Sequence, residues 1–253
     1  MIKKRLLTCS VTLVLVVISS FFIFGKTDTK MVAKKAVGYK FIYAKKEVSN
    51  DFSFADEAIP LNNARINRKM QYSLAKNSYR NVQSDVLHKK AAKLFPIIEP
   101  ILKAYGIPDD FKYIPLVESG LCSGTSPKGA AGLWQFMAGT ARTYGLRVGH
   151  GRDERQNVRK STIAACVYLK ELYGEFKSWT LTAAAYNIGS IKLERAINKQ
   201  SEDNYFRMHF NRETGTYVYK LIAMKQIIEN PSQYGYKTLY TYNLQPADLL
   251  AFN

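Results

Sequence analysis

The sequence is poor in cysteine and histidine, and this shortage removes several classes of function. Its 253 residues include three cysteines and three histidines. No cluster of His, Cys and Asp has the spacing of a metal site, and no phosphate-binding loop or dinucleotide-binding motif is present. We therefore expect neither a metal ion nor a cofactor.

Acidic residues are also scarce. The chain holds 20 Asp and Glu against 37 Lys and Arg, which gives a formal net charge of +17. A surplus of this size favours a polyanionic partner, such as nucleic acid, an anionic membrane surface or an acidic cell-wall polymer. No basic block is combined with a recognisable nucleic-acid motif, so nucleic acid is the least favoured of the three.

The few cysteines leave two alternatives open. Cys9 lies in an apolar N-terminal stretch, so only Cys122 and Cys166 remain in the rest of the chain. These two residues could form one disulfide in an oxidising compartment. They could equally be two separate small buried thiols, and the sequence does not choose between the alternatives.

The N-terminus has the form of an export signal or a signal anchor. Lys3, Lys4 and Arg5 precede an uncharged stretch from Leu6 to Phe24, which is close to the roughly 20 residues needed to span a bilayer. No clear small-x-small cleavage site follows, which favours an uncleaved anchor in residues 1–25. The basic end is then expected in the cytoplasm and the rest of the chain across the membrane.

The remaining chain divides into three parts. Residues 26–61 show no sustained period and are interpreted as a tether. Residues 62–235 carry apolar side chains at steps of three and four residues, which predicts one mainly helical domain. Pro96 and Pro100 are expected to break or kink the second helix. Within this domain, further helices are expected at 161–176, 179–187 and 214–229. Residues 236–253 are interpreted as a C-terminal tail.

The segment "YIPLVESGLCSGTSPKGAAGLWQFM" at 113–137 places one carboxylate, Glu118, at the end of an apolar run. Asp109 and Asp110 are good first residues for a helix, which would then be apolar nearly all round and buried. Burial raises the pKa of a carboxyl group, and a protonated carboxyl group can donate a proton to a leaving oxygen. The alternative is an ordinary helix-end Glu paired with Lys or Arg.

The residues after Glu118 favour a binding cleft. Residues 124–132, "GTSPKGAAG", form turns with little side-chain bulk, so that backbone can approach a ligand closely. Residues 133–137, "LWQFM", then combine aromatic area with one amide.

These motifs resemble those of the lytic transglycosylases, lysozyme-like enzymes that act on peptidoglycan, and most closely the membrane-bound type D branch. The first signature is similar to "ESG" at 118–120, "SPKGAAGLWQFM" at 126–137 and "GTARTYGL" at 139–146. The second is similar to "AAAYNIGS" at 183–190, and the third to "ETGTYVYK" at 213–220. They occur in the family's order, which is more specific than any single match. The resemblance implies a mainly α fold similar to goose-type lysozyme.

The resemblance also implies a reaction with one catalytic residue. Glu118 would protonate the glycosidic oxygen between N-acetylmuramic acid and N-acetylglucosamine. It would then accept the proton of the muramic acid 6-hydroxyl as that oxygen closes on C1. The product carries a 1,6-anhydro sugar, and no water is consumed.

Further site residues follow from the same resemblance. Trp134 is expected to pack in the core rather than contact the sugar. Asn187 has helix C-cap as its alternative role, and Ser119 has a turn role. The residues expected to contact substrate or the catalytic acid are Ser119, Ser126, Gln135, Met137, Tyr186, Asn187, Glu213 and Tyr217.

Two other functions remain open at this stage. A lysozyme-type hydrolase usually needs a second carboxylate, and Asp153 and Glu154 are the nearest downstream of Glu118. Their setting, "GHGRDERQN", favours a polar loop with local salt bridges instead. A non-catalytic scaffold that binds peptidoglycan is the second alternative. In each case we expect peptidoglycan strands as the partner and the bacterial cell envelope as the location.

Overall fold

The computed structural model describes residues 52–236, and this part of the chain is mainly helical, as predicted. The helices are α2 (Ala64–Asn77), α3 (Tyr79–Val82), α4 (Val86–Ala104), α5 (Tyr113–Ser119), α6 (Ala138–Thr143), α7 (Val158–Phe176), α8 (Trp179–Ile188), α9 (Ser190–Gln200) and α10 (Thr214–Glu229). Short 3-10 turns lie at Asp109–Lys112 (η1), Glu154–Gln156 (η2) and Pro231–Tyr234 (η3). Two small antiparallel hairpins pair β1 (Ser53–Phe54) with β2 (Glu57–Ala58) and β3 (Val148–Gly149) with β4 (Arg152–Asp153).

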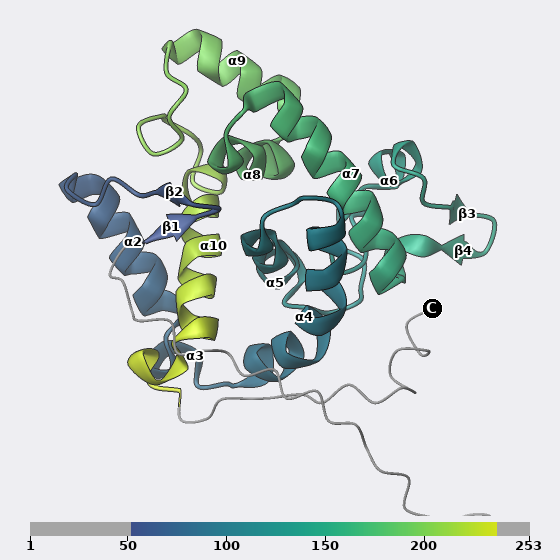
Figure 1. Ribbon diagram of the computed structural model, residues 1–253, viewed down its shortest axis with the longest axis horizontal. Coiled ribbons are helices and arrows are strands. Elements are labelled where there is room, and N and C mark those ends of the chain that lie inside the picture. The colour runs from purple at the N-terminus through teal and green to yellow at the C-terminus, as the bar shows by residue number, and fades with distance from the viewer. Residues whose placement is uncertain (1–51, 237–253) are drawn as a thin grey trace, which may run out of the picture. The chain divides into compact units, whose positions relative to one another are not determined.

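The most central helix of this fold is α10, which contacts α2, α5 and α8 (Figure 1). Its sequence explains the position, because apolar or aromatic side chains occupy nearly every side of it: buried residues include Tyr217, Val218, Leu221, Ile222 and Met224. A helix that is apolar all round is stable only when other elements cover it on every side. The α5 helix packs against this helix, and Tyr113 at its start packs edge-on against Phe95 of α4.

The two prolines of α4 do not interrupt it, so the predicted break is wrong. The helix runs from Val86 to Ala104 with Pro96 and Pro100 inside it. Each proline removes a backbone hydrogen bond and crowds the preceding turn. Burial of Leu94, Ile98 and Leu102 on one face outweighs that loss, because packing decides most helical stability in proteins.

The predicted tether is too long at its C-terminal end, because residues 53–58 form the first hairpin of the folded domain. Phe54 is fully buried in the core and packs on Phe111 with ring centroids 5.0 Å apart. The hairpin turn is Ala55–Asp56, and both residues have left-handed backbone, with φ of 51° and 64°. This two-residue turn matches the twist of the paired strands.

The later helices agree closely with the sequence pattern. The α10 helix has the predicted bounds, and α7 begins earlier than predicted because Asn157 caps its amino end by accepting from the Lys160 N–H. The α6 and α9 helices were not predicted, since both are short and bury little. In α9 only Leu193 is buried.

Between residues 52 and 236 no helix combines the length and apolar character required to cross a bilayer. The predicted anchor at Leu6–Phe24 and the predicted tail from residue 237 lie outside the described residues. Of the two cysteine alternatives, the structure has separate thiols. Cys122 is exposed and Cys166 is buried, and both are free.

Candidate active site

Glu118 lies in the last turn of α5, at the edge of the core. The segment starts with the η1 turn, continues into α5 and ends at Gly120, whose φ of 59° is the left-handed backbone that closes many helices. Pro115 lies in the first turn of α5, where its missing N–H is not needed. Because Tyr113, Ile114 and Leu116 are buried, the helix has little freedom to shift.

One strong hydrogen bond defines the surroundings of Glu118. The hydroxyl of Tyr217 on α10 donates to Glu118 Oε1 at 2.6 Å. Burial raises the pKa of the Glu118 carboxyl, and this hydrogen bond opposes the rise. The charge of Glu213 raises the pKa further, while Lys220 lowers it. Burial is the largest of these causes, so the group retains its proton to a higher pH than an exposed glutamate.

Two tyrosines, the buried Tyr217 and the half-buried Tyr186, face this acid from different helices. Burial raises the pKa of both Tyr186 and Tyr217 well above the ordinary value, and the nearby charge of Glu118 raises it further. The Tyr186 hydroxyl donates to the backbone oxygen of Trp134 at 2.7 Å. Tyr186 therefore links α8 to the loop before α6, whereas Tyr217 holds the acid directly.

Asn187 and Glu213 meet beside this acid. The amide of Asn187 donates to Glu213 Oε1 at 3.4 Å and accepts from the Thr214 hydroxyl at 3.0 Å. Gly189 is the residue that ends α8, so the alternative in which Asn187 is the C-cap is wrong. Asn187 instead joins the end of α8 to the start of α10.

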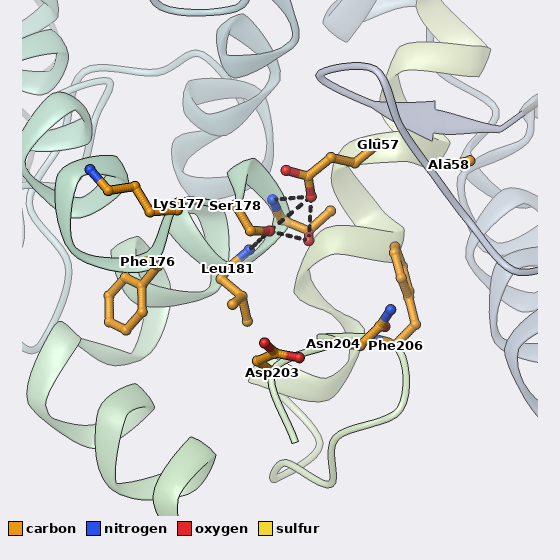
Figure 2. A pocket seen from close by; sticks show the side chains of 10 residues that line it. Glu57, Ala58, Phe176, Lys177, Ser178, Leu181, Asp203, Asn204 and Phe206 are labelled. Carbon is orange, nitrogen blue, oxygen red and sulfur yellow. Dashed lines mark hydrogen bonds between the residues drawn. The ribbon is translucent and has the colours of Figure 1, made fainter. Parts of the chain in front are cut away.

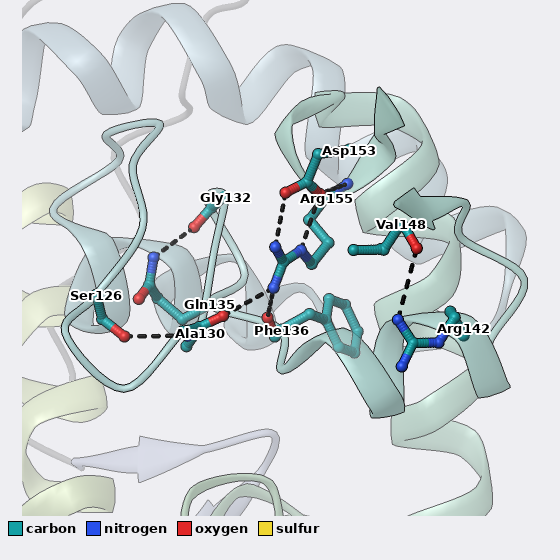
Figure 3. A network of polar contacts seen from close by, with 10 residues as sticks. Ser126, Ala130, Gly132, Gln135, Phe136, Arg142, Val148, Asp153 and Arg155 are labelled. Atoms are coloured by element: carbon teal, nitrogen blue, oxygen red, sulfur yellow. Dashed lines mark hydrogen bonds and ion pairs between the residues drawn. The ribbon is translucent and has the colours of Figure 1, made fainter. Parts of the chain in front are cut away.

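The loop between α5 and α6 is fastened by Arg155 (Figure 3). The buried guanidinium donates through Nη1 to the backbone oxygens of Gly129 at 2.8 Å and Phe136 at 3.0 Å. Asp153 accepts from Nε and Nη2 of the same side chain, which neutralises its charge. This bidentate geometry is specific to arginine and fixes the loop's shape.

Two of the predicted binding residues shape this loop from within. The Ser126 hydroxyl accepts from the Ala130 N–H at 3.1 Å, and the Gln135 amide donates to the Gly132 oxygen at 2.8 Å (Figure 3). Gln135 also has left-handed backbone, with φ of 49°. The Ser126 and Gln135 side chains each keep a polar group that these bonds do not use, the hydroxyl hydrogen of Ser126 and the amide oxygen of Gln135. Both residues can therefore still contact a ligand.

The remaining residues of this region divide between packing and exposure. Ser119 donates its hydroxyl hydrogen to the backbone oxygens of Pro115 at 2.8 Å and Leu133 at 3.0 Å, which is the turn role. Trp134 is fully buried, as expected for a packing residue, and donates to the Thr162 hydroxyl at 3.0 Å. Met137 is 49% exposed and is available for contact.

Asp153 and Glu154 form local ion pairs, as the polar-loop interpretation predicted. Arg155 lowers the pKa of Asp153, and hydrogen bonds from Arg147 and Lys160 lower the pKa of Glu154 to about 2. Glu154 lies 2.6 Å from Arg147 and 2.7 Å from Lys160. Both carboxylates are engaged in ion pairs, and neither is among the groups that hydrogen-bond to Glu118 or shift its pKa.

A cavity of about 440 Å³ lies elsewhere, beside the first hairpin (Figure 2). None of its lining residues is among those around Glu118. We therefore base the candidate site on the geometry around Glu118 and not on cavity size. The lining residues are Glu57, Ala58, Phe176, Lys177, Ser178, Thr180, Leu181, Asp203, Asn204 and Phe206.

Replacing Tyr217 with phenylalanine is expected to raise the pKa of Glu118. The hydroxyl stabilises the ionised carboxylate, so its loss favours the protonated form and extends that form to higher pH. A ¹³C NMR titration of glutamate side chains measures this shift, with Glu118 assigned from the Glu118→Gln spectrum.

Tyr219→Phe is the matched control on the same helix. The Tyr219 hydroxyl is buried and has no hydrogen-bond partner within residues 52–236. Its removal should leave the Glu118 titration unchanged. A pKa that stayed constant or fell in Tyr217→Phe would contradict the assigned hydrogen bond.

Sequence reasoning missed the role of Arg155. It placed this residue in a polar loop, and nothing in its local pattern shows that the side chain turns inward. The one usable signal was Gly132 at the end of the turn-forming loop, because glycine lets another backbone segment approach closely. The described residues contain no group of three or more His, Cys, Asp or Glu able to hold a metal ion.

Comparison with known proteins finds one matching family and several similar proteins. The family described as "Transglycosylase SLT domain" matches residues 96–208. Membrane-bound lytic murein transglycosylase D from Escherichia coli strain K12, and the protein of the same name from strain O6:H1, are each 32% identical over 179 residues. These alignments cover 68% of this chain and 39% of each relative.

A solved structure is also similar. The X-ray structure of an inactive mutant of lytic transglycosylase Slt from Pseudomonas aeruginosa aligns with a TM-score of 0.40 and 18% identity, covering 58% of this chain and 25% of that one. The chain spans about two fifths of the length of its two E. coli relatives. Residues 96–208 are a transglycosylase SLT domain, and over 68% of its length the chain is similar to two membrane-bound lytic murein transglycosylases.

Proposed function

We propose that this protein is a peptidoglycan lytic transglycosylase in which Glu118 acts first as acid and then as base. The observation that carries the proposal is the single carboxyl group at the site with a raised pKa, hydrogen-bonded to Tyr217. A proton donor must retain its proton near neutral pH, and burial provides that condition. Membership of the SLT family supports the same assignment.

The first step is proton transfer from Glu118 to the glycosidic oxygen between N-acetylmuramic acid and N-acetylglucosamine. The C1–O bond then breaks with both electrons leaving on that oxygen. The Glu118 carboxylate next accepts the proton of the muramic acid 6-hydroxyl, whose oxygen bonds to C1. The acid is regenerated, and the product carries a 1,6-anhydro ring.

Tyr217 serves both halves of this cycle. Its hydroxyl stabilises the carboxylate after the first proton transfer, because a hydrogen bond to the charged form lowers the pKa. The substrate hydroxyl replaces the second carboxylate that ordinary glycosidases require. This agrees with the ion pairs that occupy Asp153 and Glu154.

The other residues are proposed to bind the glycan. Met137 is exposed beside the loop and offers an apolar contact. Asn187 and Glu213 present an amide and a carboxylate at the junction of α8 and α10, where they can contact sugar hydroxyl or acetamido groups. Polar groups of this kind, placed on rigid helix ends, give orientation rather than affinity. The full proposed set is Ser119, Ser126, Gln135, Met137, Tyr186, Asn187, Glu213 and Tyr217.

We further propose that the protein acts in the bacterial cell envelope, anchored by residues 1–25. The supporting observations are the basic and then apolar N-terminal pattern and the words "membrane-bound" in the names of the relatives. The net charge of +17 favours a wall polymer that carries peptide carboxylates.

Mass spectrometry of products released from purified peptidoglycan tests the function. We expect muropeptides with 1,6-anhydro ends, which are one water lighter than those made by a hydrolase. Products of hydrolytic mass would instead establish a lysozyme-type enzyme. Peptidoglycan that is bound and left intact would establish a non-catalytic scaffold.

A further inference from the structure

The first hairpin lies before the matched family region, yet it contacts two elements that carry the site. The β1–β2 hairpin covers residues 53–58, whereas the family match begins at residue 96. One contact is made by the backbone of the turn and the other by the side chain of Glu57. Each contact joins the hairpin to an element whose other end lies at Glu118 or beside it.

The Glu57 carboxylate caps the amino end of α8. Its Oε1 accepts from the Trp179 N–H at 2.5 Å, and Oε2 accepts from the Thr180 N–H at 3.0 Å. The hydroxyls of Thr180 and Ser178 also donate to Oε2, at 2.7 and 2.9 Å (Figure 2). An anion at this end of a helix satisfies free N–H groups and matches the helix dipole.

The opposite end of α8 is part of the candidate site. Tyr186 faces Glu118, and Asn187 contacts Glu213 at the start of α10. The intervening residues Ala183, Ala184 and Ala185 are fully buried. A short helix with a packed middle moves as a rigid body, so a shift at Ser178 is transmitted to Tyr186.

The turn of the same hairpin is tied to the segment that leads into α5. The Ala55 N–H donates to Asp110 Oδ2 at 2.7 Å, and Lys225 of α10 lies 2.7 Å from that same oxygen. Asp110 belongs to η1, directly before the helix that carries Glu118. The sequence predicted that the Asp110 carboxylate caps the helix. In the structure it mainly binds the hairpin turn instead.

An apolar bridge joins the two contacts. Phe54 packs on Phe111 with ring centroids 5.0 Å apart, and Phe111 packs edge-on against Trp179, the first residue of α8, at 5.3 Å. The hairpin, η1 and the start of α8 therefore form one packed unit. Such a unit sets the distance between Glu118 on α5 and Tyr186 on α8.

We propose that Glu57 is a positioning residue for the catalytic centre, which acts by fixing the start of α8 relative to the segment that carries Glu118. This inference rests on the proposed function of Glu118. A displacement of about 1 Å at a reacting group can cost up to about a hundredfold in rate. Glu57 itself touches neither Glu118 nor the residues around it.

The test compares full-length wild type with Glu57→Gln, which keeps the side chain's shape and removes its charge. The glutamine amide carries an NH₂ donor, which cannot accept from the backbone N–H groups of α8. The cap is therefore weakened. We expect kcat for anhydro-muropeptide release to fall about tenfold, with KM changed less than about twofold. We also expect the pKa of Glu118 to fall, because a loosened α8 admits water beside it.

Two further variants complete the design. Thr180→Val removes one hydrogen bond to Glu57 and should give a smaller change in the same direction, which covers the case in which Glu57→Gln fails to fold. Glu202→Gln is the control, because Glu202 accepts from the Asn204 N–H and touches neither α5 nor α8. Its kcat and its Glu118 titration should match the wild type.

The Glu118 titration separates failure of this inference from failure of the proposed function. If the wild type releases no anhydro products, the function is wrong, but the ¹³C titration still reports on the position of α8. If Glu57→Gln and Thr180→Val lower thermal stability while kcat and the Glu118 pKa stay at wild-type values, Glu57 is only structural and the proposal is overturned.

Discussion

Glu118→Gln is expected to reduce release of anhydro-muropeptides at least about a thousandfold, because the variant has no proton to donate. Glutamine keeps the size of the side chain and can still accept from the Tyr217 hydroxyl, so the packing of α5 should be preserved. Loss of the buried ionisable group also removes a cost of burial, and the folded state should be at least as stable as the wild type. The measurement is the initial release rate from purified peptidoglycan, followed by mass spectrometry.

The matched control is Glu194→Gln on the exposed part of α9. It removes the same charge at a distance from the residues around Glu118, and its rate should equal the wild-type rate. Full activity in Glu118→Gln would show that another group supplies the proton. The assignment of the catalytic acid would then be wrong, even though the fold and the family would stand.

Gly132→Ala is expected to lower the free energy of unfolding by more than about 3 kcal/mol and to abolish activity. A Cβ at this position would lie 1.9 Å from the backbone oxygen of Arg155. The backbone also has φ of 76°, which costs a side-chain-bearing residue about 1–2 kcal/mol by itself. Because the contact is with backbone, no side-chain movement can relieve it.

The consequence for activity follows from Arg155. Its guanidinium holds the Gly129 and Phe136 oxygens, so a displaced Arg155 backbone releases the loop that carries Ser126 and Gln135. Differential scanning calorimetry should show a fall in Tm of about 10 °C. Gly139→Ala is the control, since Gly139 has open space around it and helical backbone in α6, and it should be neutral or stabilising. Equal stability of the two variants would contradict the close approach at Gly132.

Much of the helical pattern was readable from the sequence because it depends on local periodicity. The bounds of α10 follow from its apolar residues and from Pro231, which cannot continue the helix. The break predicted at Pro96 and Pro100 failed for the opposite reason. The loss of helix stability caused by a proline can be predicted from the local sequence. The burial of Ile98 and Leu102 that compensates for it cannot, because α4 packs against α7, which is distant in sequence.

The candidate site shows the same division. An isolated Glu118 at the end of an apolar run already predicted a raised pKa, because burial acts on the residue itself. The partners that tune it could not be read from spacing, since Tyr217 and Tyr186 come from separate helices. The hairpin at 53–58 was mistaken for tether because two-residue strands leave no periodic signal.

By itself, the sequence determined the mainly helical class and the family motifs in their order, and it predicted Glu118 as the acid. Each of these depends on neighbouring residues along the chain, where covalent geometry and side-chain periodicity act directly. Only the tertiary structure decided that Tyr186 links α8 to the loop at Trp134, that Arg155 fastens the loop between α5 and α6, and that Glu57 caps α8. These contacts join residues far apart in the chain, and they exist because burial of the shared core brings their helices together.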